Sequence, residues 1–291
     1  MKRVFALGNF DGVHCGHNAV LAELRALAAD HDAAPCVITF SPHPRRVLYP
    51  DAPPFQLVDE YDKEQLLHAA GIAEVVVLAF TPALAALEPE DFLEQKIFSL
   101  KDVVGIVVGD DFAFGAKRRG NVALLQGVCA ARGVSCVVVS GAAAPTGARY
   151  GSSAIRAALF EGMVETATAL LGRPWAISGT VEPGDGAGRG LGFPTANIAL
   201  GEYTRPRFGV YAVRVGELRG VANIGVKPTI GGMREPVLEV HLFDVEADLY
   251  GRRLSVELVK FIRPEMKFSG VEALKAQIGE DAQAARAIIK S

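Results

Sequence analysis

The sequence predicts an α/β domain built on a parallel sheet, followed by a smaller domain of antiparallel strands that ends in a helix. In the first half, continuous apolar runs alternate with helical patterns, which is typical of a parallel sheet covered on both faces. From Trp175 onward, apolar runs are separated by glycine-containing turns with no helices between them, which favours an antiparallel sheet or barrel.

The expected strands of the first half are short apolar runs bounded by glycine or polar residues. They are predicted at residues 4–7, 36–40, 75–80, 103–108 and 134–139. Helices are predicted at residues 18–29, 88–100, 122–132 and 152–171. Gly172 and Pro174 then interrupt the pattern, which places a domain boundary near residues 160–174.

The second half contains four further apolar runs and one helical pattern. Strands are predicted at residues 210–215, 220–224, 237–245 and 254–261. Ser269 and Glu272 have capping-box spacing, so a last helix is expected from Ser269. The predicted organisation is a first domain at residues 1–160, a helical connection at 161–174 and a second domain at 175–291.

Length and charge limit the classes of function. A chain of 291 residues with 50% hydrophobic residues is long enough for two cores. The net charge is −3 and the basic residues are scattered, which disfavours a nucleic-acid partner. No apolar run reaches the roughly 18 residues that a membrane span needs, and nothing implies a protein partner. We expect a cytoplasmic protein whose four cysteines are reduced and structural.

The most informative segment, GNFDGVHCGHN at residues 8–18, lies between the first strand and the first helix. His14 and His17 have HxGH spacing, and Gly16 between them allows backbone to approach a ligand closely. Free N–H groups at a helix start favour anions, so this pattern predicts a site for phosphate groups and their transfer. The alternative is a turn with two exposed histidines.

Other candidate binding residues also follow strands or start helices, where ligands of parallel sheets bind. They are Asn9 and Asp11 in the first loop, His43 in TFSPHP, Asp111, Phe112, Phe114 and Arg118 in GDDFAFGAKRRG, and Ser152, Ser153 and Arg156 in SSAIR.

A second candidate site begins with GDGAGRGLGFPTANI at residues 184–198, where glycines allow backbone N–H groups to line phosphates. Thr195 and Asn197 offer hard oxygen ligands suited to Mg²⁺. Glu239 projects from a predicted strand on the same face as His241 and Phe243, and it could accept a proton from an attacking hydroxyl. The alternatives are a surface hairpin and a solvated glutamate. The further candidates for substrate binding here are Gly188, Arg189, Gly192 and Pro194.

The motifs GNFDGVHCGH, TFSPHP, GDDFAFG and SSAIR closely resemble the adenylyltransferase module of bacterial bifunctional riboflavin kinase/FMN adenylyltransferases, a Rossmann-like member of the HxGH nucleotidyltransferases. The segments GFPTAN, ANIGVKPTIGG and FIRPEMKFSGVEALKAQI resemble the riboflavin kinase module of the same enzymes, a small antiparallel β-barrel. The resemblance implies that riboflavin and ATP give FMN, and that FMN and a second ATP give FAD and pyrophosphate.

The resemblance also implies roles for individual residues. His14 and His17 would contact ATP phosphates, Asp111 and its neighbours would line the pocket for FMN and ATP, and Ser152, Ser153 and Arg156 would form a second phosphate-binding element. In the second domain, Thr195 and Asn197 would lie at Mg²⁺ and ATP, Glu239 would be the base for the riboflavin 5′-hydroxyl, and Arg263 would lie near the flavin.

This sequence departs from the family pattern at three positions. Cys15 stands where the family usually has Leu, Asn18 where it has Gln, and Gly151 where it has the first Ser of SSTxIR. The last two motivate an alternative, a single-activity enzyme with a weak adenylyl site. A flavin-binding or flavin-sensing protein is a further alternative. The HxGH chemistry alone would also fit acceptors such as pantetheine phosphate or nicotinamide mononucleotide, but the kinase-like second half argues against them.

Overall fold

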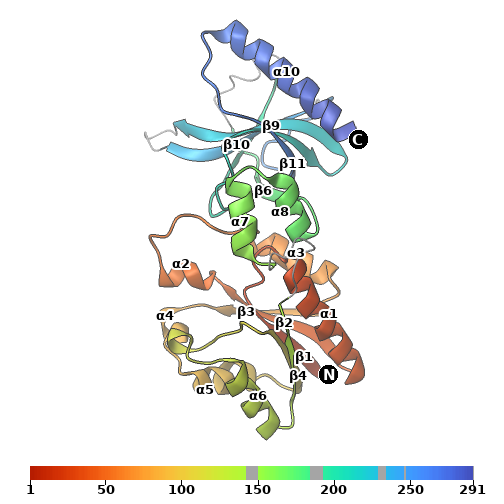
Figure 1. Cartoon of the computed structure of the whole chain (residues 1–291), viewed down its shortest axis with the longest axis vertical. Coiled ribbons are helices and arrows are strands. Elements are labelled where there is room, and N and C mark those ends of the chain that lie inside the picture. The colour runs from red at the N-terminus through yellow and green to blue at the C-terminus, as the bar shows by residue number, and fades with distance from the viewer. Residues whose placement is uncertain (142–149, 184–192, 229–233, 246, 291) are drawn as a thin grey trace. The chain divides into compact units, whose positions relative to one another are not determined.

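The chain forms two compact units. The computed structural model describes residues 1–141, 150–183, 193–228, 234–245 and 247–290. The first unit comprises Met1–Pro53 and Glu60–Gly151, and the second comprises Pro54–Asp59 and Ser152–Ser291 (Figure 1). The segments 54–59 and 152–160 thus pack in the second unit, although the sequence pattern groups them with the first domain. The predicted boundary between the two functions stays a prediction.

The first unit is built on a five-stranded parallel sheet with the order β3-β2-β1-β4-β5. The strands are β1 (Arg3–Leu7), β2 (Ala34–Ser41), β3 (Glu74–Ala79), β4 (Val103–Gly109) and β5 (Ser135–Val139). The helices are α1 (Cys15–Asp30), α2 (Pro44–Leu48), α3 (Glu60–Ala69), α4 (Pro82–Ala85), α5 (Pro89–Phe92) and α6 (Val122–Ala131). The predicted Rossmann-like fold is therefore confirmed.

Both faces of this sheet are buried, as the continuous apolar strands predict. Alternate residues of β1 point to opposite faces, so Val4 and Ala6 join one core and Phe5 and Leu7 join the other. Helices α1 and α3 cover the first face, and α5 and α6 cover the second (Figure 1).

Three predicted helices differ in detail. Helix α1 begins at Cys15 rather than at residue 18, because His14 caps it. The helix predicted at residues 88–100 is the short α5 followed by a π-helical turn, Leu93–Ile97. The helical stretch 152–171 is divided into α7 (Ser152–Phe160) and α8 (Val164–Leu171), because Gly162 between them takes a left-handed φ of 77°.

The second unit is a nearly closed antiparallel barrel with the strand order β6-β11-β8-β9-β10-β7. Its elements are β6 (Trp175–Thr180), β7 (Ala196–Ala199), β8 (Gly209–Val215), β9 (Leu218–Pro228), β10 (Arg234–Leu242), β11 (Arg253–Pro264) and α10 (Val271–Lys290). The predicted barrel and C-terminal helix are confirmed, although α10 begins two residues after Ser269.

Helix α10 packs on one face of the barrel sheet. Ala282, Ala285 and Ile289 form a core cluster with Val210 and Val221 of β8 and β9. At the same interface, Asp281 accepts two hydrogen bonds from Arg263 of β11, at 2.8 and 2.6 Å, and both side chains are largely shielded from solvent. This apolar cluster and the ion pair together hold the helix against the barrel.

A short segment from the first third of the sequence completes the second unit. We call Pro54–Asp59 the strap. The backbone of its residue Leu57 accepts a hydrogen bond from the Trp175 indole at 2.8 Å. Asp59 accepts a bond from the Tyr203 hydroxyl at 3.3 Å and pairs with Arg253. These polar contacts satisfy two aromatic side chains that are almost fully buried.

The cysteines are free thiols. Burial and the nearby Glu74 carboxylate raise the pKa of Cys36 to about 11, so this side chain stays protonated at neutral pH. A hydrogen bond with Cys136, together with burial, raises the pKa of Cys129. In the part of the chain that the structure describes, no helix is long and apolar enough to cross a membrane.

The strap predicts a stability effect confined to the second unit. We expect Asp59→Ala to lower the free energy of unfolding of that unit by about 1–3 kcal/mol, because the buried Tyr203 hydroxyl loses its hydrogen bond to Asp59 and Arg253 loses its ion pair. The single tryptophan, Trp175, lies in this unit, so urea unfolding followed by its fluorescence measures the effect. Glu217→Ala, in the exposed β8–β9 turn, is the control. An unchanged transition in Asp59→Ala would contradict the prediction.

Candidate functional sites

The loop between β1 and α1 is strained and largely buried. Phe10, Gly12 and Val13 have φ values of 49°, 85° and 40°, and the two apolar side chains are almost fully buried. Each non-glycine residue in this region costs roughly 1–2 kcal/mol, which the packing of the two side chains must offset. Thr39 of β2 also holds the loop by donating a hydrogen bond to the Asn9 carbonyl at 3.2 Å. The loop is therefore a fixed support for the residues that follow it.

The two histidines of the HxGH motif cap α1 reciprocally. His14 is the N-cap residue, and its Nδ1 accepts the backbone N–H of His17 at 3.3 Å. The Nδ1 of His17 accepts the backbone N–H of His14, also at 3.3 Å. The rings stack with centroids 3.7 Å apart and planes 14° from parallel. Because both Nδ1 atoms are acceptors, the neutral rings carry their protons on Nε2.

This arrangement is suited to binding an anion. Two parallel imidazoles present Nε2–H donors beside the first turn of α1, where the helix dipole also favours negative charge. Gly16 between them leaves room for this stacking, because a Cβ there would lie only 3.1 Å from the His14 ring and 3.1 Å from Tyr150. Asp11, in the preceding loop, is 95% buried.

A third histidine repeats the capping on the neighbouring strand. His43 follows β2 and caps α2, and its Nδ1 accepts the backbone N–H of Arg45 at 3.1 Å. Strands β1 and β2 are adjacent and parallel, so His43 and the HxGH loop lie at the same edge of the sheet. The structure therefore brings His43, Asn9 and the two stacked histidines to one edge, as the sequence predicts.

The predicted residues after β4 divide between core and surface. Asp111 lies two residues after Gly109, the last residue of β4. If Gly109 carried a Cβ atom, that atom would lie 3.2 Å from Asp111 Oδ1. Phe112 and Phe114 stack with ring centroids 5.4 Å apart, and Phe114 is buried in the core beside Phe92. Arg118 is exposed on a turn with φ 57°. The roles of these side chains toward a substrate stay predictions.

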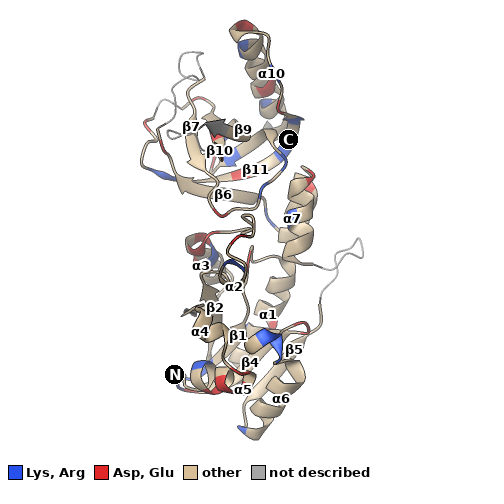
Figure 2. Cartoon of the chain, turned by 90° about the vertical axis from the view of Figure 1, so that its left-hand side faces the viewer, with Lys and Arg blue, Asp and Glu red and all other residues tan. Residues whose placement is uncertain are grey.

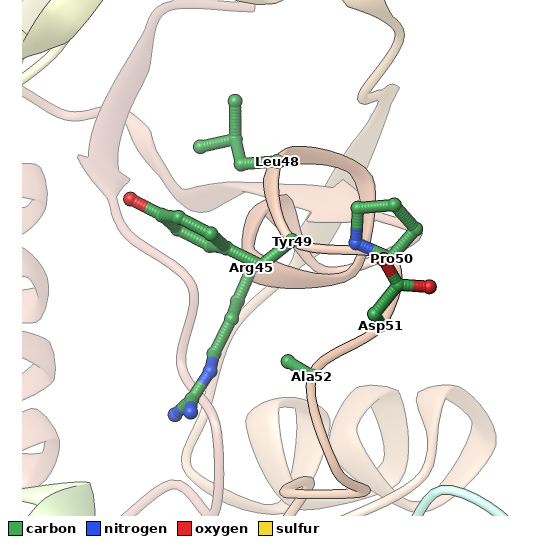
Figure 3. Close-up of a pocket in the computed structure, with 6 residues that line it drawn as sticks. All are labelled: Arg45, Leu48, Tyr49, Pro50, Asp51 and Ala52. Carbon is green, nitrogen blue, oxygen red and sulfur yellow. The ribbon is translucent and has the colours of Figure 1, made fainter.

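One pocket beside His43 was not foreseen in the sequence analysis. It has a volume of about 610 Å³ and is lined by Arg45, Leu48, Tyr49, Pro50, Asp51 and Ala52 (Figure 3). Arg46 fixes its wall by donating to the carbonyls of Pro50 and Ala52 at 2.8 and 2.7 Å. Leu48, the last residue of α2, and Tyr49, which follows it, are both more than half exposed. The feature of the sequence that could have indicated this pocket is the position of its lining residues directly after His43.

The SSAIR residues begin α7 and so belong to the second unit. Ser152 and Ser153 are the first residues of the helix. The Nε of Arg156 donates to the Phe55 carbonyl of the strap at 2.6 Å, and its guanidinium lies 5.6 Å from the Phe55 ring. Part of the Arg156 side chain is thus engaged within its own unit. The predicted contribution of these three residues to the HxGH site stays a prediction.

In the second unit, strand register brings the predicted metal and base residues together. Glu239 of β10 lies directly opposite Asn197 of β7 and directly opposite Asn223 of β9. Side chains at opposite positions share one face, with Cβ atoms about 4.5–5.5 Å apart. Asn197 is 91% buried, and Thr195 lies two positions before it in the chain. Asn197 and Glu239 therefore face one small volume.

His241 holds the chain segment that carries Thr195. Its Nδ1 lies 2.9 Å from the Pro194 carbonyl, an acceptor, so this nitrogen carries the proton. Its ring also meets Phe193 edge to face, with centroids 5.3 Å apart. The alternation of side chains along the predicted strand placed His241 on the same face as Glu239. Only the structure shows that His241 contacts Pro194 and Phe193. Gly188, Arg189 and Gly192 lie outside the described residues.

Arg263 lies on the same transverse row as Glu239, at the far side of the sheet. It is opposite Val210, which is in turn opposite Asn223. Its guanidinium is bound by Asp281 and lies 5.8 Å from the Phe268 ring. The proximity of Arg263 to a flavin stays a prediction. The structure shows in addition that Arg263 binds Asp281 of α10.

Lysine and arginine are interspersed with aspartate and glutamate along the described elements (Figure 2). Among the residues that the structure describes, no group of three or more His, Cys, Asp or Glu could hold a metal ion. A divalent ion at the predicted ligands Thr195 and Asn197 would need further oxygen ligands, such as those of a bound phosphate compound.

Comparisons with known proteins match both halves. Residues 1–153 match the family model described as FAD synthetase, and residues 171–289 match the one described as riboflavin kinase. The chain is 41% identical over 288 residues to the bifunctional riboflavin kinase/FMN adenylyltransferase of Escherichia coli K12, covering 97% of this chain and 91% of that protein. It is 39% identical over 292 residues to the protein of the same name from Bacillus subtilis, covering 98% and 92%.

The fold also matches a solved structure. A crystal structure described as a macrolide-efflux protein from Streptococcus pneumoniae superposes with a TM-score of 0.85 at 29% identity. The match covers 98% of this chain and 94% of that one.

The reciprocal cap predicts separable effects on stability. We expect His14→Ala to destabilise the start of α1 by about 1 kcal/mol, because the His17 N–H loses its acceptor. His14→Asn should retain most of the stability, since asparagine is a good N-cap residue. Amide hydrogen exchange of the first turn of α1 measures both, with His43→Ala at α2 as the control. Equal exchange in the alanine and asparagine variants would contradict the prediction.

Proposed function

This chain belongs to the bifunctional riboflavin kinase/FMN adenylyltransferase family, and we propose that its two reactions take place at the two sites described above. The enzyme phosphorylates riboflavin with ATP to give FMN, and it transfers an adenylyl group from a second ATP to FMN, giving FAD and pyrophosphate. We propose that the HxGH site carries out adenylyl transfer and that the Glu239 site carries out phosphorylation. A cytoplasmic location would supply the ATP that both reactions use.

The stacked histidines carry the proposal for adenylyl transfer. The FMN phosphate attacks the α-phosphorus of ATP, and pyrophosphate leaves. Negative charge must be stabilised on the phosphate oxygens while the groups are held in line. The Nε2–H groups of His14 and His17 are donors that the capping bonds already hold in place. Ser152, Ser153 and Arg156 are proposed to bind the departing phosphates, and Asn9, Asp11, Asp111 and Arg118 to line the nucleotide pocket.

The pocket beside His43 is a candidate site for the ring system of FMN. A flavin ring is flat and largely apolar, and the pocket offers Leu48, Tyr49 and the Arg45 guanidinium (Figure 3). His43 directly precedes the helix that lines the pocket, and its neutral ring carries the donor on Nε2, because its Nδ1 accepts the capping bond. Phe112 is proposed as a second ring contact.

The kinase proposal rests on Glu239 between two asparagines. The riboflavin 5′-hydroxyl gives its proton to the Glu239 carboxylate while its oxygen attacks the γ-phosphorus of ATP, and ADP leaves. This assignment requires the carboxylate and the nucleotide-binding residues to face one volume, and the β7–β10 register supports that requirement. Gly188, Arg189, Gly192 and Pro194 are proposed to contact ATP, and Arg263 the flavin.

The donor set at this site fits Mg²⁺. Thr195 supplies a hydroxyl and Asn197 an amide carbonyl, both hard oxygen donors. Bound Mg²⁺ would neutralise charge on the transferred phosphate group. The residues of this chain would orient that complex: the His241 bond to Pro194 fixes the approach of Thr195, and the strand pairing fixes Asn197.

The two-site proposal predicts that the activities can be removed one at a time. We expect His14→Asn to abolish FAD formation from FMN while leaving FMN formation from riboflavin within about twofold, since the capping bond survives and the imidazole does not. We expect Glu239→Gln to show the reverse pattern. Chromatographic separation of flavins after incubation with ATP and Mg²⁺ measures both. If either variant lost both activities in equal proportion while remaining folded, the assignment of one site to each reaction would fail.

The metal assignment predicts a specific shift in Mg²⁺ dependence. We expect Asn197→Ala to raise the Mg²⁺ concentration that gives half-maximal FMN formation by about tenfold, because an oxygen ligand is lost. FAD formation from FMN by the same protein should keep its Mg²⁺ dependence and serves as the internal control. Titration of both reactions at saturating ATP measures the shift. Equal shifts in the two reactions would count against Asn197 as a ligand.

A further inference from the structure

The sheet face that carries Glu239 presents more polar groups than proton transfer requires. Asn223 of β9 lies directly opposite Glu239, on the side away from Asn197. The side chains of Asn197, Glu239 and Asn223 thus form a transverse row across three neighbouring strands. Strands lie about 4.8 Å apart, so the row presents successive polar groups at this spacing.

A second carboxylate approaches the same row. A Cβ on Gly225, two positions beyond Asn223, would overlap the Glu265 carboxylate and would lie 3.2 Å from Asn223 Nδ2. Glycine at 225 therefore leaves the space that Glu265 occupies beside Asn223. Arg263, two residues before Glu265, is held by Asp281 of α10, which fixes the course of the chain that delivers Glu265.

Neither group is needed to satisfy the fold. Among the described contacts, the amide of Asn223 and the carboxylate of Glu265 have no hydrogen-bond partner in the chain, and Glu265 is exposed. The amide offers both donors and an acceptor, and the carboxylate offers only acceptors. Such a mixture suits hydroxyl groups, which donate and accept at once.

Resting on the assignment of Glu239 as the base, we propose that Asn223 and Glu265 bind the secondary hydroxyls of the ribityl chain of riboflavin. The hydroxyl that reacts is the terminal group of this polyol chain, so the hydroxyls next to it must lie near Glu239. Asn223 and Glu265 extend the polar row from Glu239 in one direction, whereas Asn197 and the metal lie in the other. Asn223 and Glu265 thus make the kinase site specific for a polyol.

The test compares two acceptors in the full-length enzyme. One is riboflavin, and the other is a flavin whose N10 chain is a hydroxypentyl group, which keeps the terminal hydroxyl and lacks the others. We expect Asn223→Ala and Glu265→Ala each to lower kcat/KM for riboflavin about tenfold, the loss of one good hydrogen bond. For the hydroxypentyl flavin, we expect kcat/KM to stay within about twofold of the unaltered enzyme. Gly225→Ala should behave like Glu265→Ala, because its methyl group displaces the carboxylate.

The controls separate this proposal from the one on which it rests. Glu217→Ala, in the exposed β8–β9 turn, should change neither acceptor. Glu239→Gln should abolish phosphorylation of both acceptors; retained activity there would sink the assignment of the base, whatever the polyol variants do. If Asn223→Ala and Glu265→Ala lost activity equally with both acceptors, their role would be structural, and the polyol proposal would be overturned. Unchanged kcat/KM for riboflavin would overturn it as well.

Discussion

Backbone pairing between strands is the constraint on which both sites depend. In the first unit, parallel pairing puts the ends of β1 and β2 at one edge, so the loops that carry His14, His17 and His43 lie at that edge. In the second unit, antiparallel register places Glu239 opposite Asn197. A shift of one residue in β10 would turn Glu239 to the other face of the sheet. The positions of the residues at both proposed sites therefore depend on backbone hydrogen bonds between strands, in which no proposed catalytic side chain takes part.

At the proposed adenylyl site, the same side chains would serve both stability and chemistry. His14 and His17 satisfy backbone donors at the start of α1, and the same bonds fix which nitrogen of each ring faces outward. The strained loop before them holds this geometry before any phosphate arrives. Electrostatic stabilisation is most effective when the donors need no reorganisation. The double role also explains why an alanine variant at either histidine would confuse folding with catalysis.

The kinase unit uses α10 in a comparable way. The ion pair between Arg263 and Asp281 docks the helix, and the chain that follows Arg263 carries Glu265 to the polar row beside Asn223. Gly225 makes the approach sterically possible. The strap adds a further constraint, because residues from the first third of the chain supply acceptors for Trp175 and Tyr203. Folding of the kinase unit thus draws on sequence that the family model assigns to the adenylyltransferase half.

The sequence by itself determined the two architectures and the motif residues, because apolar periodicity and glycine placement are local properties of the chain. It indicated His14, His17, Asn197 and Glu239, since each lies in a short pattern with a direct chemical meaning. Only the tertiary structure decided that the histidines cap their own helix, that His241 binds the Pro194 carbonyl, and that Glu265 lies against Gly225. It also decided that the strap packs with the barrel. These contacts depend on register and on packing between segments distant in sequence, and no local pattern records either.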